Sequence, residues 1–183
     1  FLGKGSYFSN LTGEKLSEHH VTRSVDAVTK RLGVGPSTYS VAPCWDDRQP
    51  YYGLFVEEGD ALTGSRGAEF LDALEASLCE HNSEYESKRA SGRLGPVRLV
   101  VVRQGFWAEW DRQRLLRSGG VPEQYKHPCL VGDVHFRESV PVVGEAVGVD
   151  EAETDPVRRR LVVAQQVGEL GVGARAGGEH VPG

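Results

Sequence analysis

The stretch "GPVRLVVVRQGFW" (residues 95–107) holds a nearly continuous apolar run from Val97 to Val102, bounded by Pro96 and Gly105. Valine-rich runs of this length are typical of strands that are covered on both faces. The run therefore predicts a strand inside a sheet, and the fold depends on which segments lie beside it and over it.

A hairpin is predicted before this strand. In "STYSVAPCW" (residues 37–45) larger and smaller side chains alternate, as they do along a half-buried strand. Pro43 lacks a backbone N–H, so this strand belongs at a sheet edge. The turn "DDRQP" (46–50) leads into a returning strand, "YYGLFVEEG" (51–59).

Helices are predicted on either side of these strands. Between residues 17 and 32 four valines and leucines recur at intervals of four, three and four, Ser17 is a suitable N-cap, and a glycine ends the pattern. Similar patterns predict a helix over about 65–81, a short one from a capping box at Ser83 ("SEYE"), and one over about 106–117. This order predicts an α+β domain in which a small mixed sheet packs with three or four helices.

The composition narrows the function. The 183 residues include 21 Lys and Arg and 26 Asp and Glu, for a formal net charge of −5. This balance argues against nucleic acid or an anionic membrane as the main partner. Three widely separated cysteines give no disulfide framework and suit a reducing compartment, so we expect a cytoplasmic protein.

The character of the chain changes near residue 139. After Phe136 there is neither an aromatic residue nor a lysine, and Gly, Ala, Val, Glu and Arg dominate. We therefore expect a folded domain over residues 1–138 and a poorly ordered tail over 139–183, in which "VRRRLVVAQQVGEL" could form a short helix. Because the sequence contains no methionine, we also expect it to be the carboxy-terminal part of a longer protein.

Several motifs that would carry chemistry are absent or weak. No Gly-x4-Gly-Lys-[Ser/Thr] phosphate loop occurs, and "GVGARA" (171–176) lacks the preceding strand that a dinucleotide turn needs. His19 and His20 would point about 100° apart on a helix, which makes a poor metal pair. His127 and Cys129 flank a proline and could form a thiolate–imidazole pair or a metal clip, but no second ligand cluster accompanies them. We expect no metal site and interpret these four residues as ordinary polar side chains.

Two loop lysines remain. Lys15 lies in "SNLTGEKLSE" (9–18), where Gly13 and its polar neighbours predict a tight turn before the first helix. Lys126 lies in "GVPEQYKHPCLVGD" (120–133), a segment too short and too rich in proline for a helix. Composition and spacing alone leave each as an ordinary solvent-exposed lysine.

Four segments resemble, in the right order, the carboxy-terminal domain of the auxin-responsive acyl-acid amido synthetase family. "SNLTGEKLSEHHV" (9–21) resembles the family's hinge pattern Ser-Asn-x-x-Gly-[Asp/Glu]-Lys-x-x-Glu, and "YSVAPCWDDRQPYYGLFVEEGD" (39–60) resembles the hairpin that follows it. "GRLGPVRLVVVRQGFW" (92–107) is similar to the family's Gly-Pro, buried strand and Gly-aromatic sequence. "SGGVPEQYKHPCLV" (118–131) matches the pattern Gln-Tyr-Lys-x-Pro followed by Cys.

The chain also departs from this family. Thr12 stands where the family often carries a carboxylate, and the Arg expected beside Cys129 is missing. The segment from residue 139 onward matches nothing in the family. The resemblance therefore covers residues from about 6 to about 137.

The resemblance implies a fold and a role. Members of this family are adenylate-forming enzymes, in which a large amino-terminal domain holds ATP, Mg²⁺ and the acid, and a small lid moves over it. The complete enzyme would activate a small carboxylic acid as an acyl-adenylate and pass the acyl group to the amine of an amino acid. Carried over to this sequence, the resemblance implies that Lys126 is catalytic, that Lys15 and Lys126 contact phosphate, and that Gly13 lies at the hinge. The implied partners are the amino-terminal adenylation domain and these substrates.

Two other interpretations stay open: a stand-alone binding module that reuses the lid fold, and a decayed remnant of an enzyme. The lid interpretation requires the Lys126 amine to be free to reach a neighbouring domain. An internal ion pair at Lys126 would therefore exclude it.

Overall fold

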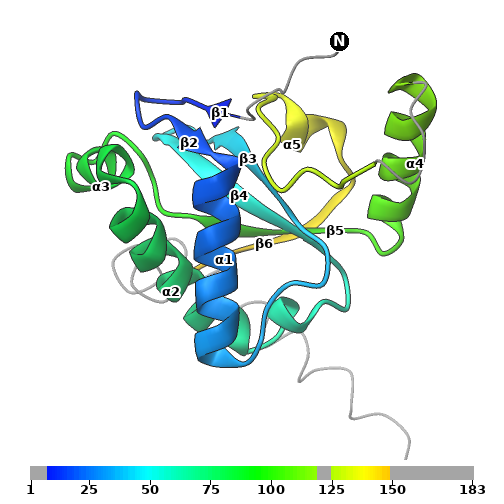
Figure 1. The fold of residues 1–183 in the computed structure, drawn as a ribbon, viewed down its shortest axis with the longest axis horizontal. Coiled ribbons are helices and arrows are strands. Elements are labelled where there is room, and N and C mark those ends of the chain that lie inside the picture. Colours follow the sequence, from blue (N-terminus) through cyan, green and yellow to red (C-terminus); the bar gives the residue numbers. More distant parts are fainter. Residues whose placement is uncertain (1–7, 119–124, 149–183) are drawn as a thin grey trace, which may run out of the picture. The chain divides into compact units, whose positions relative to one another are not determined.

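A computed structural model describes residues 8–118 and 125–148. Their centre is a four-stranded sheet in the order β3-β4-β5-β6 (Figure 1). The strands are β3 (Ser40–Trp45), β4 (Pro50–Glu57), β5 (Arg98–Val102) and β6 (Val142–Val147). β4 and β5 run parallel, and the two outer pairs are antiparallel. The predicted hairpin and the predicted edge position of the Pro43 strand are confirmed.

The two central strands are covered on both faces. Neighbouring side chains along them enter two different hydrophobic clusters, with Leu54 and Leu99 in the first and Phe55 and Val100 in the second. All four of these side chains are 3% exposed or less. The strand predicted from the apolar run at 97–102 is therefore confirmed, together with its burial on both sides.

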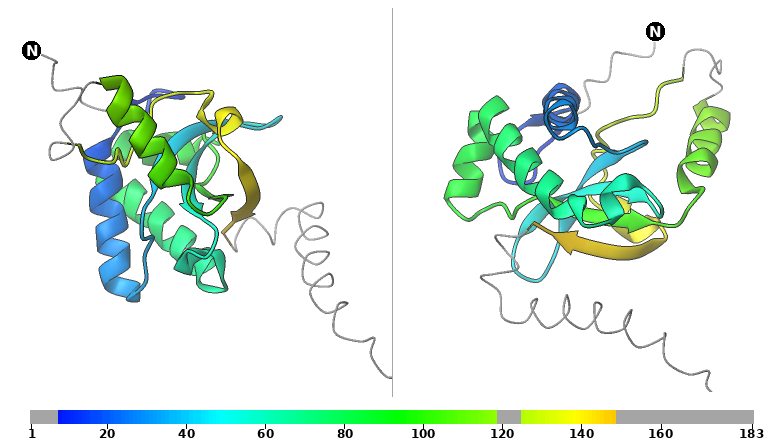
Figure 2. Two further views of the ribbon diagram at one scale, coloured as in Figure 1. Left: turned by 90° about the vertical axis from the view of Figure 1, so that its right-hand side faces the viewer. Right: turned by 90° about the horizontal axis from the view of Figure 1, so that it is seen from below.

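Helices pack around the sheet (Figure 2), and both clusters include side chains from them. The first cluster receives side chains from α1 (Glu18–Leu32), α2 (Arg66–His81) and α3 (Ser83–Ala90). The second receives them from α4 (Phe106–Ser118) and the short α5 (Phe136–Ser139). The expected α+β architecture and order of elements are confirmed. The structure adds α5, the 3-10 helix η1 (Ala61–Thr63) and a small ladder of β1 (Phe8–Ser9) with β2 (Leu16–Ser17).

Two helix starts test the predicted caps. Ser17 caps α1 as expected: its Oγ accepts from the N–H of His20 at 3.2 Å, and the N–H of Ser17 donates to His20 Nδ1 at 3.3 Å. For α3 the cap is Asn82, whose Oδ1 accepts from the N–H of Tyr85 at 3.0 Å. The predicted capping box at Ser83 is wrong by one residue, because the amide oxygen before it already occupies the capping position.

The expected domain boundary at residue 139 is also wrong, because residues 142–147 form β6 in the main sheet. The buried Arg98 of β5 explains how β6, which carries Glu145, is held beside β5. Its guanidinium lies 3.4 Å from Glu145 on β6 and 2.5 Å from Asp46, and Arg137 lies 2.6 Å from Glu145. Residues 149–183, with "GVGARA" and the possible short helix, lie outside the described residues.

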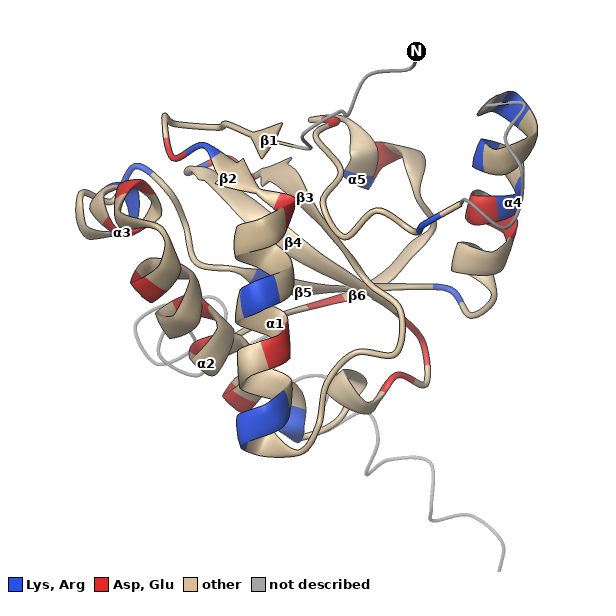
Figure 3. Cartoon of the chain, in the orientation of Figure 1, with Lys and Arg blue, Asp and Glu red and all other residues tan. Residues whose placement is uncertain are grey.

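Charge is distributed in both signs over the domain. Basic and acidic residues are both present along α1 and α4 (Figure 3). Among the described residues, no helix combines the length and the apolarity that crossing a bilayer requires.

Candidate functional site at two lysine loops

The first lysine loop, residues 10–15, connects β1 to β2. Gly13 has a φ of 111°, a conformation that side chains disfavour, so the turn requires glycine there. Lys15 has a φ of 46° and is the one non-glycine residue of the described chain with positive φ. The side chain of Lys15 is exposed.

A buried carboxylate holds this loop in shape. Glu14 accepts hydrogen bonds from the N–H of Leu11 at 2.7 Å, the N–H of Thr12 at 2.8 Å and the Thr12 hydroxyl at 3.0 Å. It also accepts one from the hydroxyl of Tyr52 on β4, and its backbone oxygen accepts from Asn82 Nδ2 at 3.0 Å. Burial alone would raise the pKa of Glu14, but these donors more than offset it and leave the pKa below its usual value.

The second lysine loop, residues 125–131, is fastened to α4 and β3. The Tyr125 hydroxyl donates to Asp111 Oδ1 at 2.6 Å, and His127 Nδ1 lies 2.8 Å from the same oxygen. On its other side, His127 Nε2 lies 3.0 Å from Ser40 Oγ. Lys126, between these two anchored residues, is exposed.

The end of the second loop pairs with the edge of the sheet. The Ser40 hydroxyl donates to the carbonyl of Pro128 at 2.7 Å, and the N–H of Val41 donates to the carbonyl of Cys129 at 2.8 Å. The N–H of Val131 donates back to the carbonyl of Val41 at 2.8 Å. This short parallel bridge leaves little freedom to the residues that follow Lys126.

One hydrogen bond joins the second loop to the start of α1, close to the first loop in the chain. The N–H of Cys129 donates to Glu18 Oε1 at 2.7 Å, and Glu18 begins α1 directly after β2. Lys15 and Lys126 each lie three residues before one end of this bond. The fold therefore brings both lysine loops to the same region of the domain.

The condition that would exclude the lid interpretation is not met. Lys126 forms no ion pair with any residue in the described part of the chain, and its side chain is exposed. Its side chain is therefore open to solvent.

His20 and His127 have structural partners, and the chemistry of Cys129 is limited by burial. No group of three or more His, Cys, Asp or Glu residues within 8–118 and 125–148 could hold a metal ion. His20 completes the cap of α1, and His127 pairs with Asp111. Burial raises the pKa of the Cys129 thiol, which disfavours the thiolate that a reactive cysteine needs. The burial of Cys129 thus argues against the thiolate–imidazole pair that its sequence neighbourhood allowed.

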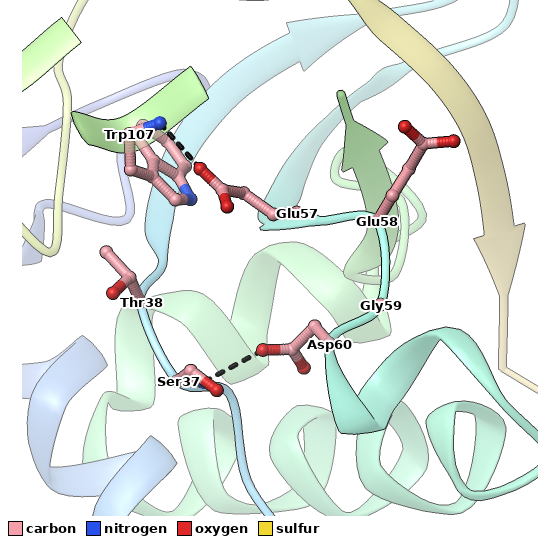
Figure 4. A pocket seen from close by; sticks show the side chains of 7 residues that line it. All are labelled: Ser37, Thr38, Glu57, Glu58, Gly59, Asp60 and Trp107. Carbon is pink, nitrogen blue, oxygen red and sulfur yellow. Dashed lines mark hydrogen bonds between the residues drawn. The ribbon is translucent and has the colours of Figure 1, made fainter. Parts of the chain in front are cut away.

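A small acidic pocket lies between the segment before β3, the turn after β4 and the start of α4 (Figure 4). Its volume is about 190 Å³, and it is lined by Ser37, Thr38, Glu57, Glu58, Gly59, Asp60 and Trp107. The carboxylates already accept backbone hydrogen bonds: Glu57 from Trp107 at 2.7 Å, and Asp60 from Ser37 at 2.9 Å. We interpret these carboxylates as structural: the hydrogen bond from Trp107 to Glu57 fixes the start of α4 against the end of β4. Sequence reasoning missed the pocket, although the acidic turn "VEEGD" (56–60) was the available signal.

The loop partner Asp111 was also missed. It lies in a helix of mixed polarity, and nothing in "EWDRQ" (109–113) distinguishes it from a solvent-exposed aspartate. Only the packing of α4 beside the second loop reveals its role.

Comparison with known proteins identifies the family. The model of the "GH3 family C-terminal domain" matches residues 19–135, a range that contains Lys126 but begins after Gly13 and Lys15. A solved structure, "GH3.15 acyl acid amido synthetase", superimposes with a TM-score of 0.62 at 17% sequence identity. A second, "AtGH3.15 acyl acid amido synthetase in complex with 2,4-DB", gives a TM-score of 0.59 at 17% identity. No curated protein matches the chain.

The two structural matches share one fold with this domain. Each covers 81% of this chain but only 28% of the solved chain, so the chain spans about a quarter of those proteins. Because the family match extends over more than half of the sequence, the chain belongs to the GH3 family, in the region of that family's C-terminal domain.

Proposed function

We propose that this domain is the mobile lid of an ATP-dependent acyl-acid amido synthetase, and that Lys126 acts in the first of its two half-reactions. The enzyme would convert a small carboxylic acid and ATP to an acyl-adenylate and pyrophosphate. It would then transfer the acyl group to the amine of an amino acid. The observation that carries the proposal is the exposed Lys126 amine on a loop anchored at residues on both sides of it.

The chemistry explains why a lysine is useful at this position. When a carboxylate attacks the α-phosphorus of ATP, two anions approach each other, and negative charge builds on the phosphoryl and bridging oxygens. A compact ammonium placed beside those oxygens lowers the barrier. On a mobile lid this charge can leave the site before the amine arrives for the second step.

ATP and Mg²⁺ would be bound mainly by an amino-terminal adenylation domain, since the sequence contains no phosphate loop of its own. From this domain, the exposed ammonium groups of Lys126 and Lys15 would contact phosphate oxygens, and Gly13 would serve as the hinge, a role that its positive φ supports. Its three free cysteines support a cytoplasmic location.

The test is acid-dependent ATP–pyrophosphate exchange by a complete enzyme that contains this lid. We expect Lys126→Ala to reduce the exchange rate by about 10²–10³-fold, by analogy with the loss of one preorganised donor. Lys30→Ala, at another exposed lysine, is the matched control and should leave the rate unchanged. Transfer from a supplied acyl-adenylate should survive in Lys126→Ala. Undiminished exchange in this variant would refute the assigned role.

A further inference from the structure

The imidazole of His127 is surrounded by hydrogen-bond acceptors. Nδ1 lies 2.8 and 3.1 Å from the two carboxylate oxygens of Asp111. Nε2 lies 3.1 Å from the carbonyl oxygen of Tyr39 and 3.0 Å from Ser40 Oγ. Ser40 has a single hydroxyl hydrogen, and its oxygen lies 2.7 Å from the carbonyl of Pro128, which can only accept.

These contacts determine where the protons lie. The Ser40 hydrogen is committed to Pro128, so Nε2 faces two oxygens that offer it no proton and must itself donate. Nδ1 faces a carboxylate, which also only accepts when ionised. From this arrangement of acceptors we infer that both ring nitrogens of His127 carry hydrogen, so that the ring is an imidazolium paired with the Asp111 carboxylate.

The surrounding rings suit this cation. The His127 ring lies 4.8 Å from the Trp107 ring and 5.6 Å from the Trp110 ring, measured between centroids. Aromatic rings attract cations placed near them, more strongly where water is excluded. The side chain of His127 is only 17% exposed.

Other charged and titratable groups lie around the ring. The Tyr125 hydroxyl donates to the same carboxylate, and the Arg114 guanidinium lies 4.5 Å from the centre of the Trp110 ring. Lys126, next in the chain, is exposed to solvent. β3 contributes uncharged oxygens, and Asp111 is the group that directly balances the charge of His127.

We propose that the Asp111–His127 ion pair positions Lys126, a role that rests on the function proposed above for this lysine. Tyr125 and His127 flank Lys126, and both are bonded to Asp111 on α4. His127 precedes a proline, which favours extended backbone, and alternate side chains of an extended segment point to opposite sides. With its two neighbours held on α4, Lys126 is directed away from the helix and toward solvent.

Loss of the imidazolium proton changes this arrangement in a defined way. A neutral ring protonated at Nδ1 would present a lone pair at Nε2 to the carbonyl of Tyr39. Ser40 could turn its hydroxyl to Nε2, but the carbonyl of Pro128 would then lose its donor. Either outcome weakens the loop within two residues of Lys126.

The first experiment needs no catalytic partner. Nitrogen-15 NMR of the 183-residue chain with labelled histidine, at pH 7, should show both ring nitrogens of His127 in the protonated range. Asp111→Asn should convert the ring to a form with one unprotonated nitrogen, whereas Asp47→Asn, at an exposed aspartate, should leave it unchanged. A neutral His127 ring in the unaltered chain would overturn the proposal.

The second experiment follows ATP–pyrophosphate exchange by the complete enzyme. Asp111→Asn should lower kcat about tenfold at pH 7, the effect of losing one charge-assisted hydrogen bond, with little change in the KM for ATP. Asp111→Glu should restore part of the loss, and Asp47→Asn should have no effect.

The two proposals can fail separately. If Lys126→Ala has no effect, the proposed function is wrong, whatever the NMR shows. If Lys126→Ala abolishes exchange but Asp111→Asn behaves like Asp47→Asn, the lysine acts as proposed and the ion pair does not position it.

Discussion

The two lysine loops are held in different ways. The first loop (10–15) closes on a carboxylate of its own, because Glu14 accepts hydrogen bonds from the two residues at the start of the turn. The second loop (125–131) is held by groups from other elements, chiefly Asp111 on α4 and Ser40 on β3. The first loop contains its main anchor, which also contacts Tyr52 and Asn82, whereas the anchors of the second loop all lie in other elements.

This difference decides what each loop can do. The first loop has hydrogen bonds of its own in addition to those from Tyr52 and Asn82, which suits a position next to a hinge. A loop with borrowed anchors keeps its shape only while the domain is intact, and a change in α4 or in one proton can alter it. The predictions below test this contrast, from the largest effect to the smallest.

Removing the internal anchor should cost the most stability. Glu14→Ala leaves the N–H groups of Leu11 and Thr12 and the buried hydroxyl of Tyr52 without their acceptor. We expect the free energy of unfolding to fall by about 3 kcal/mol in urea denaturation, because several buried donors lose a charged partner. Glu80→Ala, at an exposed glutamate, is the control and should be nearly neutral.

The pH dependence of the stability difference between the unaltered chain and Glu14→Ala also tests whether the Glu14 charge anchors the loop. The pKa of Glu14 is lowered in the folded domain from its usual 4.5. A lowered pKa stabilises the fold above the unfolded value, and this stabilisation is lost as the pH falls through the folded value. The gap between the unaltered chain and Glu14→Ala should therefore narrow below about pH 4.5. A gap that stays constant at acid pH would show that the Glu14 charge is not the anchor.

The sequence predicted the first loop better than the second for a physical reason. A tight turn between Asn10 and the α1 cap follows from residues that are neighbours in the chain, and the structure has it there. The anchors of the second loop are far away in sequence, with Ser40 87 residues from His127 and Asp111 16 residues from it. Local patterns carry no information on such pairs, so only Lys126 and its exposure could be predicted.

Ser40→Ala should have an intermediate effect, confined to the second loop. The substitution removes the donor to the Pro128 carbonyl and a partner of His127 Nε2, both buried or partly buried. We expect a loss of about 1–2 kcal/mol in the free energy of unfolding, with faster hydrogen exchange at the Cys129 and Val131 amides. Exchange at the Thr12 amide, in the first loop, should be unchanged. Ser87→Ala, at an exposed serine of α3, is the matched control.

Pairs of residues distant in the sequence also limited the prediction of the sheet. The buried strand at 97–102 and the hairpin were visible as local patterns and were predicted. β6 was missed because its segment, "VVGEAV" (142–147), is half-exposed and carries a glycine and a glutamate. What holds it is the pairing of Glu145 with Arg98, 47 residues away, and with Arg137 on α5. Composition therefore predicted a tail from residue 139, whereas ion pairs between residues distant in the sequence hold residues 142–147 as a strand of the sheet.

The smallest expected change in stability comes from replacing Lys15, and it distinguishes a functional role of the two lysines from a structural one. Lys15 adopts a left-handed φ of 46°, which asparagine tolerates better than lysine. Lys15→Asn should therefore raise the free energy of unfolding by about 0.5 kcal/mol while lowering ATP–pyrophosphate exchange in the complete enzyme. Lys126→Asn should lower exchange without any gain in stability, because Lys126 has no positive φ to relieve. If Lys15→Asn destabilises the domain instead, the side chain of Lys15 supports the first loop, and the strained backbone is not retained for the sake of an exposed ammonium.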